Sequence, residues 1–268
     1  MQGRLLPKYK GRFQAHPLGY WQDEFPIAAE IGLQCIEFIF DYNDFDINPL
    51  WSKEGRKSIS KISTKTGVKV YSVCADFFME CPLHSKIEKK RSFSKNILIE
   101  LLQNCNELEI KDIVIPCVDQ SNLSDPQYFE LFKAQIFDII PIAENFGINL
   151  SLETDLAPLP FKELLDELNS KSVTVNYDTG NSASLGYDFR EELECYGDRI
   201  SDLHIKDRVF NGGSVFLGTG HVNLSEFFRE FGKYSFDGPI IMQLFRDDEG
   251  IAIFNEQFEV FNRLKASV

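Results

Sequence analysis

The chain has 268 residues, of which 41 are Asp or Glu and 28 are Lys or Arg, giving a formal net charge of -13. Such a charge repels nucleic acid unless a basic groove exists, and no basic run is present. No window approaches the roughly 20 apolar residues of a membrane helix, and the opening residues lack the apolar core of a signal peptide. Six scattered Cys without CxxC spacing favour reduced thiols and a cytoplasmic protein.

Short apolar runs alternate with amphipathic stretches along the chain, which predicts parallel strands joined by helices. The predicted strands cover residues 2–6, 35–40, 68–75, 113–118, 148–152, 173–176, 200–205 and 240–245. The predicted helices cover residues 23–31, 49–66, 85–108, a long stretch from 125, 161–168, a short polar segment before 196, 224–231 and 254–264. Eight such units without a linker predict an α/β protein, a single (β/α)8 TIM barrel domain over residues 1–268.

Four predicted strands carry a side chain of the metal-ligand type at or near their carboxyl ends. These side chains are Glu153, Asp178, His204 and Gln243. In a barrel the carboxyl ends of the strands form one face, and neighbouring strands lie about 4.8 Å apart, so their end residues can converge. Two carboxylates and an imidazole suit a divalent cation such as Mn²⁺, Zn²⁺ or Mg²⁺. The alternative is that each strand-end carboxylate bonds only to nearby loop amides.

The chain resembles the xylose-isomerase-like barrel superfamily of sugar and sugar-phosphate isomerases and epimerases. The resemblance rests on LE in SLETD, on YDTGN, on HIKD and on the LGTGHVNL loop, in that order. It implies a small carbohydrate substrate, a divalent ion (Mn, Mg, Zn or Co) held by Glu153, Asp178 and His204, and a homodimer by analogy. Gln243 stands where the family usually has a second Glu.

In this superfamily a base removes a proton next to a carbonyl and an enediolate forms. The epimerases resemble two-base enzymes, but the Gln243 amide cannot accept a proton near neutral pH. A single base suffices for aldose–ketose interconversion, so the resemblance favours an isomerase with Glu153 as base. An epimerase and a dehydratase remain alternatives, and Asp76, His84 or His221 could replace the missing base.

The substrate side of the predicted site rests on polar residues near strand ends. The candidates are Glu37, Asp76, His84, Lys206, Arg208 and Arg246. Cations in such a cluster would suit a phosphate or carboxylate; the alternative is that Lys206–Asp207 and Arg246–Asp247 are solvated charge pairs. The turn around Gly218 and Gly220 could bring backbone amides to an anion, although a plain turn explains the same residues.

Two other functions stay open at this point. An apurinic-site nuclease on the same barrel would need more metal ligands than four His provide, and it would need to bind DNA despite the negative charge. A barrel that lost catalysis with its fourth ligand could instead bind a sugar or a partner protein. Metal binding and proton exchange separate these readings from an isomerase.

Overall fold

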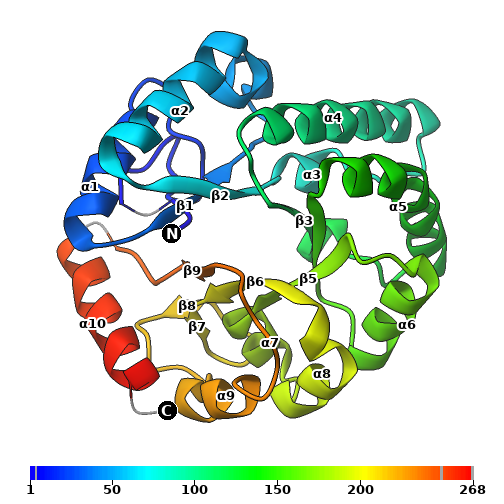
Figure 1. Ribbon diagram of the computed structural model, residues 1–268. Helices are drawn as coiled ribbons and strands as arrows, with labels where there is room; N and C mark the ends of the chain where they lie inside the picture. Colours follow the sequence, from blue (N-terminus) through cyan, green and yellow to red (C-terminus); the bar gives the residue numbers. More distant parts are fainter. Residues whose placement is uncertain (4, 248–249, 267–268) are drawn as a thin grey trace.

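The protein is an α/β barrel in the computed structural model, which describes residues 1–3, 5–247 and 250–266. Seven parallel strands form one sheet in the order β1-β2-β3-β4-β5-β6-β9. Their bounds are Cys35–Ile39, Lys69–Cys74, Asp112–Cys117, Asn149–Thr154, Val173–Asp178, Ile200–Ile205 and Ile240–Met242. The helices form a ring around this sheet (Figure 1).

The N-terminal residues lie between the first and last strands of the sheet. Gln2 makes a parallel bridge with Glu37 in β1, and the Glu37 amide donates to the Met1 carbonyl at 2.7 Å. On the other side the Gln2 amide donates to the carbonyl of Met242 in β9 at 3.4 Å. This segment therefore completes the barrel in the place of an eighth strand.

The predicted strand over residues 2–6 is therefore wrong in extent, because it is reduced to the bridge at Gln2. Gly3 has φ +57, and this left-handed conformation turns the chain out of the extended run. A Cβ at Gly3 would lie 2.7 Å from the Phe13 carbonyl oxygen, so the turn also depends on a close backbone approach. Residue 4 of the predicted strand lies outside the described residues.

Ten α-helices connect or follow the strands within the described residues. Their bounds are α1 Glu24–Ile31, α2 Lys53–Thr66, α3 Phe77–Glu80, α4 Glu88–Glu107, α5 Pro126–Phe146, α6 Pro158–Leu168, α7 Thr179–Leu185, α8 Phe189–Tyr196, α9 Leu224–Phe231 and α10 Ala252–Ala266. The predicted helix over 49–66 is divided into a 3-10 turn, Pro49–Trp51, and α2, because Ser52 is extended and caps α2 through its hydroxyl. Helix α10 closes the ring beside α1 (Figure 1).

The core fills the space between the sheet and the helices, and Phe supplies much of it. Seven Phe side chains are almost completely buried: Phe25, Phe40, Phe77, Phe78, Phe132, Phe227 and Phe254. These buried rings remove large apolar areas from water and so stabilise the core. None of the six Cys forms a disulfide. No helix of the described chain is both long and apolar enough to cross a bilayer.

Candidate active site

The candidate site is built at the carboxyl ends of three adjacent strands. Glu153 stands one residue from the end of β4, Asp178 ends β5, and His204 lies in β6. Asp178 and His204 are register partners across β5 and β6. The register therefore brings these side chains to one place in the barrel, as the order of the strands predicts.

Glu153, Asp178 and His204 form a compact buried cluster. One carboxylate oxygen from each acid and one imidazole nitrogen lie within 4.8 Å of one another. His204 Nδ1 is 3.7 Å from Asp178 Oδ2, and it has no hydrogen-bond partner among the described residues. Two carboxylates around an unpartnered imidazole nitrogen are a donor set that fits a divalent ion.

Asn181, the last residue of the YDTGN motif, connects this cluster. Its backbone amide donates to Asp178 Oδ1 at 2.8 Å and so caps α7. Its side-chain amide donates to Glu153 Oε1 at 2.6 Å, and its carbonyl accepts from Arg208 Nη1 at 2.7 Å. No role for Asn181 was predicted from the sequence, although the residue lies in the YDTGN motif. Arg208, predicted to bind substrate, therefore supports the cluster through Asn181.

Lys206 and Gln243 meet on the other side of Asp178. Lys206 Nζ lies 2.7 Å from Asp178 Oδ2 and 3.1 Å from Gln243 Oε1. The Gln243 side-chain nitrogen donates to Gln2 Oε1 at 2.5 Å. The Gln243 amide thus joins the N-terminal segment to the cluster, and its oxygen faces the ammonium of Lys206.

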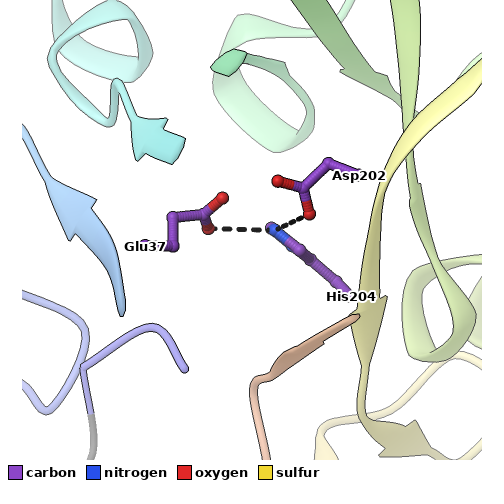
Figure 2. Close-up of side chains that lie close together, drawn as sticks. All are labelled: Glu37, Asp202 and His204. Carbon is purple, nitrogen blue, oxygen red and sulfur yellow. Dashed lines mark ion pairs between the residues drawn. The ribbon is translucent and has the colours of Figure 1, made fainter. Parts of the chain in front are cut away.

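A second pair of acids faces the far nitrogen of His204. Glu37 Oε1 lies 2.9 Å and Asp202 Oδ1 3.6 Å from His204 Nε2, and the three side chains point toward one another (Figure 2). The Ser72 hydroxyl donates to the other oxygen of Glu37 at 2.7 Å. Glu37, predicted to bind substrate, is buried inside the barrel, where its carboxylate contacts His204. Asp202, two residues before His204, was not predicted, although strand alternation places it on the same face.

The pKa values of the two acids in the cluster are shifted in opposite directions. Burial, with the charge of Asp178, raises the pKa of Glu153 to about 7. Burial is the largest single influence on Asp178 and opposes its ionisation, but Lys206 and His204 together outweigh burial and lower the pKa of Asp178. Glu153 is therefore the group poised to exchange a proton near neutral pH, and Asp178 is the permanent anion.

A cleft of about 730 Å³ opens at the ends of β1, β2 and β9, and its lining residues do not include Glu153, Asp178 or His204. Its lining includes Asp76, Arg246, and the ion pair of Arg12 with Asp41, whose atoms are 3.0 Å apart. Burial and the charge of Asp41 raise the pKa of Asp76 to about 6. Arg246 stacks over the Phe13 ring at 4.9 Å. The cleft thus offers polar groups of both signs, and the charge of its lining residue Asp76 acts on Glu153.

The two other histidines that could have replaced a base lie apart from this cleft. His84 is buried against the rings of Tyr128 and Phe132, and burial lowers its pKa to about 4. His221 Nδ1 accepts a hydrogen bond from the Phe210 amide at 2.7 Å. Neither lines the cleft or joins the cluster.

Asp207, in the short strand β7 (Asp207–Arg208), organises the glycine-rich loop that follows β8 (Ser214–Val215). Its carboxylate accepts backbone hydrogen bonds from Gly218 and Gly220 at 2.9 and 2.8 Å, and from Val222 at 3.1 Å. The alternative reading of Lys206–Asp207 as a solvated pair is therefore wrong, because Asp207 is only 1% exposed. The loop amides do approach an anion, and that anion is a side chain of the same chain.

The sequence profile of the xylose isomerase-like TIM barrel family matches residues 25–264. The chain belongs to this family. The match covers the cluster and the YDTGN and HIKD motifs, and it confirms the resemblance and the α/β barrel predicted from the sequence.

Curated relatives of this xylose isomerase-like chain match over most of their length. The putative L-ribulose-5-phosphate 3-epimerase SgbU of Haemophilus influenzae is 24% identical over 243 residues, or 85% of this chain and 84% of that protein. The L-ribulose-5-phosphate 3-epimerase UlaE of Escherichia coli is 22% identical over 245 residues, or 85% of this chain and 83% of that protein. The chain is accordingly a sugar isomerase/epimerase-like enzyme.

Solved structures share the barrel at low sequence identity. A D-tagatose 3-epimerase-like protein aligns with TM-score 0.74 and 17% identity over 90% of this chain and 91% of that one. The IOLI protein with a binding zinc atom aligns with TM-score 0.72 and 15% identity over 92% of this chain and 91% of that one. A xylose isomerase-like barrel from Mycobacterium smegmatis in complex with magnesium gives 0.71 and 15%, over 93% and 89%.

Proposed function

We propose that the chain is a divalent-metal-dependent isomerase or epimerase of a small sugar or sugar phosphate, with Glu153 as the proton-transferring base. The observation that carries this proposal is the cluster of Glu153, Asp178 and His204, whose ligand atoms lie within 4.8 Å of one another. A site that can hold a cation and that includes a carboxyl group whose pKa is raised by burial suits proton transfer next to a carbonyl.

Glu153, Asp178 and His204 would hold the ion, and the Gln243 oxygen lies close enough to Lys206 to belong to the same centre. The neighbours described with zinc and with magnesium support a divalent ion on this barrel. Such an ion, when bound, polarises a carbonyl group and stabilises the negative charge that develops on proton removal.

The residues of this chain determine how the proton moves. Burial raises the pKa of Glu153 in the metal-free site. This offsets part of the lowering that a bound cation would cause, so the carboxylate keeps basicity for proton transfer. The 2.6 Å hydrogen bond from Asn181 holds one Glu153 oxygen in place. The barrel around the cluster excludes bulk water, because all three clustered side chains are buried.

Gln243 favours aldose–ketose isomerisation, which requires one base, since its amide cannot accept a proton. The names of the relatives favour a second candidate, epimerisation at C3 of a ketose or ketose phosphate. That reaction needs a second proton-transferring group on the opposite face of the carbon. The Asp76 carboxyl, in the cleft lining and with a pKa of about 6, is the available candidate for it.

The test follows deuterium from D₂O into L-ribulose 5-phosphate and D-tagatose by NMR, with Mn²⁺ present. Label at C1 of the ketose indicates isomerisation, and label at C3 with inversion indicates epimerisation. Glu153→Gln should lower the exchange rate by about 10² to 10⁴. The matched control is Glu163→Gln on the exposed face of α6, which should exchange at the wild-type rate. Undiminished exchange in Glu153→Gln would remove Glu153 as the base.

A further inference from the structure

The ammonium of Lys206 lies beside the carboxylate of Asp178, which the proposed metal centre also needs. Its Nζ is 2.7 Å from Asp178 Oδ2, and the Lys206 and Asp178 side chains are only 12% and 1% exposed. The other oxygen of Asp178 already accepts the capping hydrogen bond from the Asn181 amide. Asp178 Oδ2 is therefore the oxygen that both Lys206 and a divalent cation would use.

The position of the Lys206 side chain depends on its surroundings. A Cβ at Gly180 would lie 2.4 Å from Lys206 Cγ, so only a glycine at this position leaves room for the side chain. The Thr179 hydroxyl donates to the Lys206 carbonyl at 2.8 Å and lies 3.2 Å from the Lys206 amide. The Gln243 oxygen contacts the ammonium at 3.1 Å. The YDTGN and HIKD motifs thus fit together around this lysine.

The charges around Lys206 also indicate that its ammonium weakens the binding of a cation. Glu153 and Asp178 are the acids of the cluster, Gln243 contributes a neutral amide, and the Lys206 ammonium cancels one negative charge. A carboxylate at position 243 would add a negative charge beside Lys206 and offset the cation. With an amide there, position 243 adds no negative charge to offset the repulsion between the ammonium and an incoming dication.

We propose that Lys206 is an internal competitor of the divalent cation for Asp178, so that the wild-type protein binds the ion more weakly than a variant without this charge. The inference rests on the metal centre of the proposed function. Metal binding would require the ammonium to withdraw from Asp178 or to share its oxygen with the ion. Gln243, which contacts the ammonium, sets the strength of this competition.

The experiment titrates metal-stripped protein with Mn²⁺ by calorimetry for wild type, Lys206→Met, Gln243→Glu and the double variant. Removing one charge next to a dication should tighten binding by about tenfold or more in Lys206→Met. Gln243→Glu should tighten it too, and the two effects should not add, since both act on one ammonium. The matched control is Lys162→Met, which removes a lysine paired with Asp166 on the exposed surface of α6.

Each outcome distinguishes the inference from the function on which it rests. If the wild type binds Mn²⁺ and Lys206→Met binds it with equal or lower affinity, the proposed competition is wrong and the metal centre stands. Failure of every variant to bind Mn²⁺ overturns the metal centre as well. If Lys206→Met does not fold, Lys206→Gln removes the charge and keeps a hydrogen-bond donor, and the same tightening is expected.

Discussion

The side-chain amide of Asn181 donates a hydrogen bond of 2.6 Å to Glu153 Oε1, and its carbonyl accepts one from Arg208 at 2.7 Å. Asn181 thus connects Glu153, the candidate base, to the guanidinium group of Arg208. Asn181→Leu should lower the rate of solvent deuterium exchange by about tenfold or more, the effect of losing one hydrogen bond to a charged group. Asn106→Leu on the exposed face of α4 serves as the control. An unchanged exchange rate would show that Asn181 does not position Glu153.

Glu37 and Asp202 face Nε2 of His204 from inside the barrel, while Nδ1 faces Asp178. A carboxylate on one imidazole nitrogen fixes the ring and directs the other nitrogen to a metal. Glu37→Gln should therefore weaken Mn²⁺ binding by about 10- to 100-fold, measured by calorimetry. Glu30→Gln, an exposed residue of α1, should bind normally. Equal affinities would assign Glu37 a role in packing only.

Glu24 is buried in α1. We expect its carboxyl group to make the free energy of unfolding depend on pH. Burial raises its pKa from 4.5 to about 7, so the folded chain binds this proton more tightly than the unfolded chain does. Its contribution is fully present below pH 4.5 and is lost as pH rises toward 7, by about 3 kcal/mol in total. Urea unfolding with chelator at pH 5 and pH 8 should show a smaller loss in Glu24→Gln than in wild type. Identical losses in the two proteins would contradict the prediction.

Asp207 accepts three backbone hydrogen bonds from the glycine-rich loop that precedes α9. Asp207→Asn replaces one acceptor oxygen by a donor that faces these amides. Urea denaturation should show a loss of about 3 kcal/mol, because buried amides lose a charged acceptor. Asp198→Asn, at an exposed site, should change stability little. If both variants unfold at the same urea concentration, Asp207 does not hold the loop.

Much of the fold could be predicted from the sequence because strand runs such as 113–118 are apolar and rich in β-branched residues. Helix α7 was missed because its residues, TGNSASL, show no apolar period, and it begins at a cap that only the structure reveals. The prediction of a strand over residues 2–6 was wrong in extent because the left-handed backbone conformation of Gly3 ends the extended run. Local propensity describes neither effect, since both depend on where the rest of the chain lies.

The convergence of Glu153, Asp178 and His204 followed from parallel strand order, which places strand ends together whatever the side-chain rotamers. The contacts of Lys206 with Asp178 and of Glu37 with His204 did not follow from it. These depend on which way each side chain turns inside the barrel. Strand alternation could have placed Asp202 beside His204, but only the structure shows its carboxylate 3.6 Å from the ring.

The central claim is that Glu153, Asp178 and His204 hold one divalent ion. Calorimetric titration of metal-stripped wild-type protein with Mn²⁺ tests it most directly, with His204→Asn as the comparison. One ion bound per chain, and binding at least about 100-fold weaker in His204→Asn, is the predicted result. No binding by the wild type, or equal affinity in His204→Asn, would contradict it.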